Sequence, residues 1–439
     1  MPSKVKIPLI FSLLFLIISV SVIIAIAYVQ THHERSLSPG LKYGIVLDAG
    51  SSRTTVYLYQ WPAEKENNTG VVNQTLKCNV KGLGISSYAN EPEKAPTYID
   101  DCLKKVKEVI PANQHNSTPA YLGATAGMRL LKLKNESAAR GVLANIHDYF
   151  QTQPFDFRGA NIITGQEEGI YGWITVNYLM GNFLEKNIWR AWVRPDGAET
   201  TGALDLGGAS TQISFLPEKS EQNANNTVEV TLYGYLYNVY THSFQCYGRD
   251  EAEKRVLAWL AQDPKLKFYE NPCFPRNYTV NFSMEHTFGR DPVLCSKKVS
   301  TLFNFISCQG KEDCSFDGIY QPNVKGNFSL PQILHRFDET YARSYCFSAN
   351  FIYYLLVHGY KFDNETWLQI NFQKEVGNSS IAWSLGYMLT LTNMIPAEKR
   401  LIVLPMSLSL FAGLLCLFTA MSVLCLIILV ILFIRARKK

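Results

Sequence analysis

Residues 42–60 read KYGIVLDAGSSRTTVYLYQ, in which two runs rich in β-branched and aromatic residues flank the small-residue turn DAGSS. This pattern predicts a β-hairpin. Residues 200–215, TTGALDLGGASTQISF, repeat the plan, because an apolar strand again ends in an aspartate, glycine and serine follow in the turn, and a second strand returns. The repeat indicates one structural unit that the chain uses twice.

Four further segments predict the elements around these hairpins. Residues 121–131 and 162–178 each look like a strand that runs through a glycine-containing turn into a helix. Residues 381–395 are typical of a helix that returns to the core. Residues 271–321 are rich in proline, asparagine and cysteine. This composition favours an irregular surface subdomain that is cross-linked by disulfides. Together these signals predict a mixed α/β fold.

Two uncharged apolar segments lie near the ends of the 439-residue chain. Residues 7–29 and 407–434 are each long enough to cross a hydrocarbon layer of about 30 Å as a helix. Residues 435–439, RARKK, predict a cytoplasmic C-terminus, because cationic residues are retained on that side. We therefore expect two membrane spans with the intervening chain outside the cytosol. A cleaved signal peptide is the alternative for the first segment, since Ala25-Ile26-Ala27 resembles a cleavage site.

The formal net charge of +5 is carried by the two ends, where six lysine and arginine residues are accompanied by no acidic residue. The middle of the chain is close to neutral and has no basic stripe, so we expect no nucleic-acid partner. Aromatic residues make up 13% of the chain, a content that excludes a disordered protein.

Cysteines and glycosylation motifs agree with an exterior location. Eight of the ten cysteines lie in residues 36–400, an even number that suits an oxidising compartment. A zinc site is poorly supported, because no CxxC pair occurs. Asn-x-Ser/Thr motifs are acceptors for N-linked glycans, and they begin at Asn67, Asn73, Asn116, Asn135, Asn225, Asn277, Asn281, Asn327, Asn364 and Asn378.

The two hairpin turns have the composition of phosphate-binding loops. Glycine allows backbone N–H groups to approach phosphate oxygens closely, and serine hydroxyls add donors. Asp48 and Asp205 would repel phosphate, so we expect them to hold a divalent cation through its water molecules. For a single copy, an ordinary Asp-Gly turn is the better interpretation, but two matching copies favour phosphate binding. The sequence contains neither a P-loop motif nor a GxGxxG motif.

The segment Gln166-Glu167-Glu168 opens a predicted helix directly after a glycine. A carboxylate at this position can act as a general base on water. Adjacent helical residues point about 100° apart, so only one of the two glutamates can face a site. The alternative is that both acidic residues only compensate the helix dipole.

Five motifs in order resemble the apyrase signature regions of the ecto-nucleoside triphosphate diphosphohydrolase family. They are DAGSS, ATAGMRLL, GQEEGIYGW, DLGGAS and IAWSLGYMLTLTNMIP. The resemblance implies a two-lobed ectodomain of the actin, sugar-kinase and heat-shock-ATPase type, with a transmembrane helix at each end. It also implies Ca²⁺- or Mg²⁺-dependent hydrolysis of extracellular nucleoside tri- and diphosphates to monophosphates.

The resemblance also assigns roles to individual residues. It makes Glu168 the catalytic base, assisted by Ser210 and Gln212, with Asp48 and Asp205 organising the water shell of the metal. Trp383 belongs to the last signature region, although a plain core aromatic is an equal alternative. Arg249 and Tyr345 resemble residues near the nucleobase. The phosphates would be lined by Ser51, Ser52, Arg53, Thr125, Gly207, Gly208, Ala209, Ser210 and Thr211.

The same resemblance divides the chain. It implies a membrane-anchored ectoenzyme with an extracellular catalytic part, contacts with membrane lipid, and a homo-oligomer through the two membrane helices. The implied segments are a cytoplasmic N-terminus (1–6), a membrane helix (7–29), lobe I (30–164), lobe II (165–381), a return to lobe I with a linker (382–406), a second membrane helix (407–434) and a cytoplasmic tail (435–439).

One departure from the family pattern concerns cysteine pairing. The stretch between Gly326 and Arg343 is shorter than in the family, and a second gap lies near 291–294. These gaps leave Cys246 and Cys346 without their usual partners, and whether they pair with each other stays open. Three family pairs remain, namely Cys78–Cys102, Cys273–Cys295 and Cys308–Cys314. A non-catalytic nucleotide-binding membrane glycoprotein is therefore the alternative to an active enzyme, whereas an adhesion or receptor ectodomain would need no paired phosphate hairpins.

Overall fold

The computed structural model describes most of the chain. Residues 41–397 form one compact unit, and residues 1–40 and 398–439 form a second unit, which is described by itself. The described residues are 3–32, 35–37, 40–65, 69–187, 192–218, 226–260, 271–275, 291–331, 344–395, 401–403 and 406–437.

The first predicted hairpin is confirmed, and it forms the middle of a five-stranded sheet. β2 (Leu41–Ala49) pairs antiparallel with β3 (Thr54–Pro62), and Asp48 lies opposite Thr55. The strand order is β4–β3–β2–β5–β6, with β5 parallel to β2 and β6 parallel to β5. The other strands are β4 (Asn73–Asn79), β5 (Pro119–Ala124) and β6 (Asp156–Ile162).

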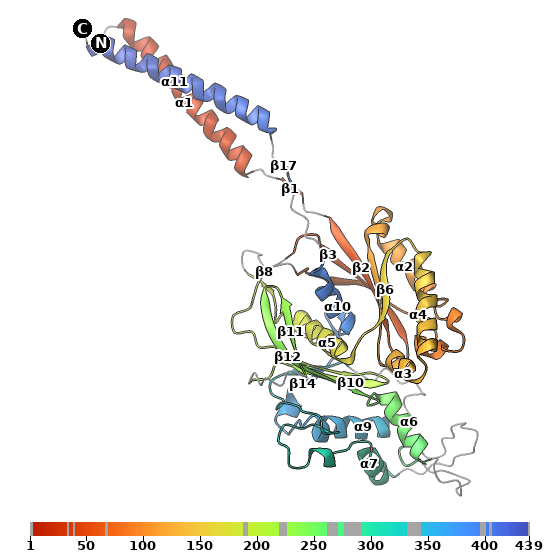
Figure 1. Cartoon of the computed structure of the whole chain (residues 1–439). Coiled ribbons are helices and arrows are strands. Elements are labelled where there is room, and N and C mark those ends of the chain that lie inside the picture. The colour runs from red at the N-terminus through yellow and green to blue at the C-terminus, as the bar shows by residue number, and fades with distance from the viewer. Residues whose placement is uncertain are drawn as a thin grey trace. The chain divides into compact units, whose positions relative to one another are not determined.

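Side chains of this sheet alternate between two cores, as the pleat of a strand requires. Ile45 and Leu47 of β2 enter a core shared with the helices on one face, whereas Val46 enters the core between the two sheets. Figure 1 shows the helices beside this sheet. They are α2 (Asp100–Val109), α3 (Ala126–Lys134) and α4 (Glu136–Gln151).

The second hairpin is also confirmed and occupies the same place in a second, six-stranded sheet. In the order β11–β12–β10–β9–β13–β14, β10 pairs antiparallel with both β9 and β12, and β13 and β14 continue parallel to β9. Each hairpin thus has an antiparallel neighbour on one side and two parallel strands on the other, which confirms the repeat. The strands are β9 (Gly202–Leu206), β10 (Ser210–Phe215), β11 (Thr227–Leu232), β12 (Tyr235–Gln245), β13 (Phe328–Leu330) and β14 (Ile370–Phe372).

Two apolar helices, α5 (Gly165–Leu179) and α10 (Trp383–Thr392), fill the space between the two sheets (Figure 1). They cross so closely that a Cβ atom added to Gly386 would lie 2.0 Å from the carbonyl oxygen of Tyr171. At the crossing, the Thr175 hydroxyl donates to the carbonyl oxygen of Ala382 at 2.8 Å and accepts from the Gly386 amide at 2.8 Å. Both helices follow the sequence expectation of a strand–turn–helix unit and a returning helix.

The far face of the second sheet is covered by α6 (Arg249–Leu260), α7 (Pro292–Ser300) and α9 (Tyr345–Tyr353). For the described part of residues 271–321, the expectation of a surface subdomain is wrong. Large aromatic side chains from this stretch, including Phe274, Phe303 and Phe316, are buried in the core of the second sheet, and α7 is regular. Burial of this much apolar surface makes the stretch part of the main fold rather than an appendage.

Two short ladders complete the described part of residues 41–397. β7 (Glu185–Lys186) pairs with β8 (Trp192–Val193), and β15 (Glu375–Val376) pairs with β16 (Ser379–Ser380). The sheets lie within residues 41–162 and 202–372, while the lobe boundaries at 164 and 381 stay a prediction.

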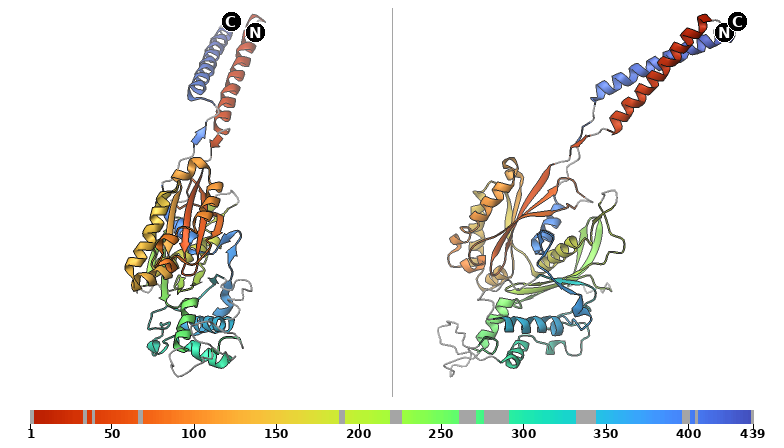
Figure 2. Two further views of the ribbon diagram at one scale, coloured as in Figure 1. Left: turned by 90° about the vertical axis from the view of Figure 1, so that its right-hand side faces the viewer. Right: turned by 180° about the vertical axis from the view of Figure 1, so that it is seen from behind.

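In the second unit, α1 (Ser3–His32) and α11 (Leu408–Arg437) pack side by side (Figures 1 and 2). Their apolar parts, Ile7–Gln30 and Ser409–Arg435, have the length and composition of membrane spans. Next to the helices, β1 (Arg35–Leu37) pairs antiparallel with β17 (Leu401–Val403).

Candidate active site

A cleft of about 390 Å³ lies where the two hairpin turns meet within residues 41–397. Residues from both sheets and from α3, α5 and α10 line it, so the two copies of the repeat contribute to one site. The lining includes Asp48, Ser51, Ser52, Arg53, Thr125, Glu168, Asp205, Gly207, Gly208, Ala209, Ser210, Arg249 and Trp383.

The second turn presents backbone amides to the cleft. The carbonyl oxygens of Gly207 and Gly208 accept hydrogen bonds from the Arg249 and Asp250 amides at 2.9 Å, and the Ala209 carbonyl accepts from the Cys246 amide at 2.8 Å. In a planar trans peptide the following N–H points away from the carbonyl. The amides after these carbonyls therefore point away from the backbone of residues 246–250, in a turn whose residues 207–210 line the cleft, as an anion nest requires.

Close packing fixes this turn in place. A Cβ atom on Gly248 would lie 2.3 Å from the Ala209 nitrogen and 2.4 Å from the Ser210 nitrogen, so a larger residue cannot occupy that position without shifting the loop. The Gly207 amide also donates to the Ser210 carbonyl at 3.0 Å, which closes the hairpin tightly.

Three carboxyl groups in the cleft are shielded from solvent, Glu168 as a buried residue and Asp48 and Asp205 as half-buried ones, and this shielding raises the pKa of each. The pKa of Asp48 is raised to about 7, mainly by burial and further by the Asp205 charge, while the hydrogen bond from Trp383 opposes the shift. Burial raises the pKa of Asp205 to about 6. Carboxylate oxygens are donors that a hard divalent cation prefers, and the raised pKa values mean that protons compete with such a cation below about pH 7. Among the described residues, no group of three or more His, Cys, Asp or Glu could hold a metal ion directly.

Glu168 and its neighbour Glu167 separate as the helical geometry predicts. The Glu167 carboxylate accepts from the Thr164 amide at 2.7 Å, and the Glu167 amide donates to the Thr164 hydroxyl, which forms a capping box on α5. Glu168 instead lines the cleft and is only 7% exposed. The helix-capping alternative therefore holds for Glu167, and Glu168 remains the candidate base.

The Glu168 carboxylate belongs to a small buried network. Its Oε2 atom accepts from Arg129 Nη2 at 2.8 Å and from Gln212 Nε2 at 3.0 Å. Both donors also reach the Ser210 hydroxyl, at 3.1 and 2.7 Å. Burial raises the pKa of Glu168 to about 7, while the charge and hydrogen bond of Arg129 act against this shift.

The buried amide oxygen of Gln212, Oε1, has no hydrogen-bond partner among the residues that the structure describes. Gln212 lines a cavity of about 20 Å³, together with Asp205 and Trp383, next to the main cleft. That volume suits a single water molecule. The orphaned acceptor is linked to the Glu168 carboxylate through the same side chain, because Gln212 Nε2 donates to Glu168 Oε2.

Trp383 combines the two interpretations of its sequence motif. Its ring is 4% exposed and packs in the core between the sheets, but its Nε1–H donates to Asp48 Oδ1 at 2.9 Å. Trp383, at the start of α10, thus orients Asp48, although the two residues are 335 positions apart in the sequence.

Two predicted residues take other positions. The Thr211 hydroxyl donates to the Asp205 carbonyl at 2.7 Å and lies 3.1 Å from the Tyr360 hydroxyl, so it supports the hairpin rather than facing the cleft. Tyr345 is half-buried at the start of α9 and is not among the described residues that line the cleft. Arg249 does line it, and its guanidinium contacts Asp250 at 2.7 Å.

The sequence interpretation missed two cations that line the cleft, and a third, Arg129, that contacts the cleft residue Glu168. Arg129 lies inside the motif ATAGMRLL, where a charged residue directly after a strand–helix turn is the signal that could have identified it. Lys77 and Lys374 line the cleft, and Lys77 lies 3.5 Å from Glu375. No local motif marks these two lysines.

Disulfides and glycosylation motifs complete the comparison. The structure forms Cys78–Cys102, Cys273–Cys295 and Cys308–Cys314, the three pairs implied by the resemblance, and leaves Cys246 and Cys346 as thiols. Asn67, Asn225, Asn277 and Asn281 lie outside the described residues. The other six motif asparagines are exposed, namely Asn73, Asn116, Asn135, Asn327, Asn364 and Asn378.

Comparison with known proteins gives a family match. The GDA1/CD39 (nucleoside phosphatase) family matches residues 35–344 and 332–404. Human ectonucleoside triphosphate diphosphohydrolase 3 is 54% identical, covering 98% of this chain and 93% of the human protein, and the mouse protein of that name is 56% identical, covering 95% and 91%. Mouse ectonucleoside triphosphate diphosphohydrolase 1 is 39% identical over 92% of this chain and 91% of its own length.

A solved nucleoside triphosphate hydrolase from Neospora caninum is similar with 12% identity and a TM-score of 0.48, covering 88% of this chain and 85% of that one. The human alignment spans 494 positions, more than the 439 residues of this chain, so the relative has segments without a counterpart here. The two matched ranges of the family overlap at residues 332–344. This overlap falls almost entirely in the stretch between Gly326 and Arg343, which is shorter than in the family.

Proposed function

Because the chain belongs to the GDA1/CD39 nucleoside phosphatase family, we propose that it is an ecto-nucleotidase that hydrolyses nucleoside tri- and diphosphates to monophosphates and phosphate. The observation that carries the proposal is the convergence of both hairpin turns and Glu168 on one cleft. Such a cleft presents amides and hydroxyls to phosphate and one buried carboxylate to water.

Enzymes accelerate phosphoryl transfer mainly by positioning the reacting groups and by neutralising the charge on the phosphates, so no covalent nucleophile is needed. The turn at 207–210 and the serines at 51 and 52 hold the phosphate chain, with Arg53 and Thr125 at its sides. Glu168 accepts a proton from the attacking water, which Ser210 and Gln212 orient through the network described above. A base with a pKa near 7 is half-ionised at neutral pH, which is the range in which general bases work best.

Asp48 and Asp205 are the residues that would hold a divalent cation, Ca²⁺ or Mg²⁺, through its water molecules. When bound, the cation would neutralise negative charge on the phosphates. The two aspartates lie at matching places in the two hairpins, opposite Thr55 and Gln212, so each lobe supplies one of them.

The two apolar helices anchor the chain in the cell membrane, with the catalytic unit extracellular, glycosylated, and in contact with extracellular nucleotides. The helix lengths and the exposed glycosylation motifs support this arrangement. The test is a mobility shift after enzymatic removal of N-glycans from intact cells that express the chain, which a cytoplasmic orientation would not give.

The activity is tested by phosphate release from ATP and from ADP on intact cells, with Ca²⁺ or Mg²⁺ added. Glu168→Gln is the active-site variant, and Glu167→Gln is the matched control, because glutamine preserves the capping box one residue away. We expect the first substitution to lower turnover by about 10²–10⁴-fold and the second to leave it nearly unchanged. Absence of release from chain that has reached the surface would instead favour nucleotide binding without catalysis.

A further inference from the structure

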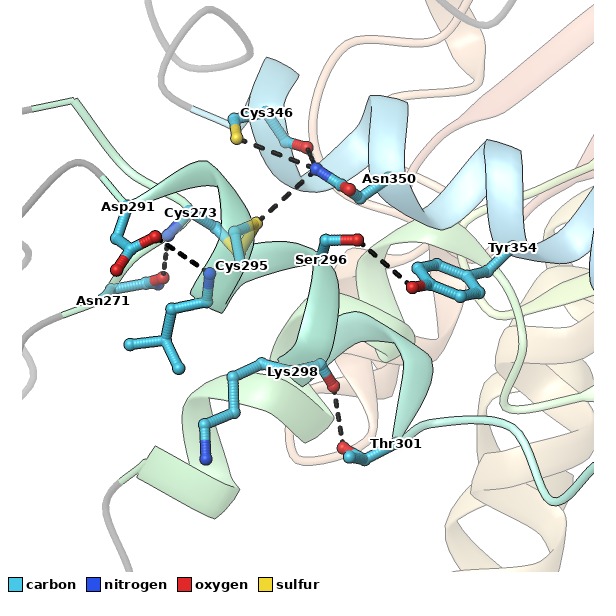
Figure 3. Close-up of a disulfide and its surroundings, with 11 residues drawn as sticks. Asn271, Cys273, Asp291, Cys295, Ser296, Lys298, Thr301, Cys346, Asn350 and Tyr354 are labelled. Carbon is cyan, nitrogen blue, oxygen red and sulfur yellow. Dashed lines mark hydrogen bonds between the residues drawn. A yellow bond between two sulfur atoms is a disulfide. The ribbon is translucent and has the colours of Figure 1, made fainter.

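Three sulfur atoms meet where α7 packs against α9 (Figure 3). The disulfide Cys273–Cys295 joins the segment before α7 to α7 itself, and its two cysteines are buried. Cys346 in the first turn of α9 is a half-buried free thiol. A thiol and a disulfide are thus neighbours in the same helix interface.

One side chain contacts sulfurs of both groups. The Nδ2 atom of Asn350, one turn after Cys346, lies 3.8 Å from Cys346 Sγ and 3.8 Å from Cys295 Sγ. The same nitrogen donates to the Cys346 carbonyl oxygen at 2.9 Å, which fixes its place along the helix. An N–H group that faces both sulfurs stabilises negative charge on a thiolate, so the amide lies where charge develops when one sulfur attacks and another leaves.

We propose that Cys273, Cys295 and Cys346 form a thiol–disulfide exchange site. The Cys346 thiol loses its proton and attacks Cys295 Sγ, a Cys346–Cys295 bond forms, and the Cys273–Cys295 bond breaks. Cys273 leaves as a thiolate and takes up one proton. The number of thiols and disulfides is unchanged, so the step needs neither oxidant nor reductant.

The exchange changes which segments of the chain are cross-linked by a disulfide. In the present arrangement the bond closes a loop between cysteines 22 positions apart. After exchange that loop is free at Cys273, and the bond joins α7 to α9 instead. Because a cross-link restricts the motion of the elements that it joins, the two isomers differ in the freedom of α9.

Helix α9 reaches the cleft through one residue. Arg249, which lines the cleft, donates from Nε to the Ser348 hydroxyl at 3.4 Å and contacts the Ser344 hydroxyl through Nη2. These two serines flank Cys346 in the sequence. The position of the disulfide is therefore coupled to the cleft by a short chain of contacts.

Disulfide mapping of the full-length chain in detergent tests the proposal. The protein is incubated at pH 8 without oxidant or reductant, quenched with acid because protonated thiols do not exchange, denatured, and alkylated with N-ethylmaleimide at acidic pH. Trypsin separates the three cysteines, because Arg276, Arg290, Lys297 and Arg343 lie between or before them. We expect a Cys295–Cys346 cross-linked peptide that grows with time, matched by alkylated Cys273.

Three variants sharpen the result. Cys346→Ser removes the attacking thiol and must abolish the new peptide, whereas Cys246→Ser removes a thiol outside the cluster and must leave it unchanged. Asn350→Leu should slow its appearance. The proposal is overturned if the unmutated chain keeps only Cys273–Cys295 with fully alkylated Cys346, or if Cys346 is found linked to Cys246 or to another chain. These readouts are independent of nucleotide hydrolysis.

Discussion

The guanidinium of Arg129 and the carboxylate of Glu168 form a buried ion pair, with 2.8 Å between Nη2 and Oε2. The two residues come from the helices that follow the neighbouring strands β5 and β6. Arg129 also donates to the Ile163 carbonyl at 3.0 Å and to Gln245 at 3.1 Å, so its position is fixed from both lobes. The positive charge of Arg129 lowers the pKa of Glu168 against the effect of burial, so more of this base is ionised at neutral pH than burial alone would allow.

Arg129→Gln should therefore shift the acid limb of the pH–rate profile to higher pH. Arg129 lowers the pKa of Glu168, so its removal lets burial raise that pKa beyond about 7. At pH 7 we also expect turnover to fall by about 100-fold, the usual loss for one transition-state contact. The measurement is the rate of ATP hydrolysis from pH 5.5 to 9. Arg140→Gln, at an exposed helix position, is the control, and an unshifted limb would contradict the assignment.

Trp383→Phe should raise the cation concentration needed for half-maximal activity. The substitution keeps most of the ring but removes the donor to Asp48, and that hydrogen bond lowers the pKa of Asp48. Protons then compete better with the cation, and we expect a requirement about 3–10-fold higher, which corresponds to the net contribution of one typical hydrogen bond. Titration with Ca²⁺ and with Mg²⁺ at pH 7 measures this change. Trp259→Phe, on the exposed side of α6, should match the unmutated chain.

Thr175→Val should lower kcat more than it changes KM. Valine has the shape of threonine but lacks the hydroxyl that joins α5 to α10, and α5 carries Glu168 while α10 carries Trp383. Loss of a buried hydrogen bond costs about 1–3 kcal/mol, which allows the helices to shift. Thr175→Ser keeps the hydroxyl and should restore kcat. Equal losses for both variants would show that only packing volume matters at the crossing.

Divalent cation should stabilise the folded chain more at pH 8 than at pH 5.5. The pKa values of Asp48, Glu168 and Asp205 are raised in the folded state to about 7, 7 and 6, above those of unfolded carboxyl groups. The folded chain then binds more protons than the unfolded chain over this range, so its stability without cation falls as pH rises through about 7. Cation binding offsets the accumulating negative charge and is opposed by protons at low pH.

Thermal unfolding with and without Mg²⁺ at the two pH values measures this linkage. The double variant Asp48→Asn, Asp205→Asn should lose most of both the pH dependence and the Mg²⁺ effect. A Mg²⁺-induced rise in melting temperature that is equal at both pH values would contradict the role of these carboxyl groups.

The sequence predicted both hairpins and the placement of Glu168 because these features are local. Alternation of apolar residues determines a strand, and an acidic residue directly after a glycine turn marks the first turn of a helix. The roles of Trp383 and Arg129 depended on contacts between segments far apart in the chain. Trp383 meets Asp48 across 335 positions of sequence, and no periodicity reports such a pairing.

The misplaced prediction at residues 271–321 has a similar origin. Cysteine, proline and asparagine are frequent in irregular surface loops, and that composition outweighed the scattered phenylalanines. Phe303 and Phe316 are 13 positions apart and share no helical or strand period, yet both pack in the core of the second sheet. Burial of isolated aromatic residues is decided by tertiary packing and leaves no local pattern.

In the sequence, the catalytic unit is flanked by β1 and β17, which pair as an antiparallel ladder within the unit of the apolar helices. In the proposed membrane arrangement, each end of that unit leads to its own anchor. A single proteolytic cut in either connection would leave the enzyme attached through the other end. Release of a soluble enzyme into the surroundings therefore requires two cleavage events, and a surface protease that cuts only once would leave nucleotide clearance at the cell surface.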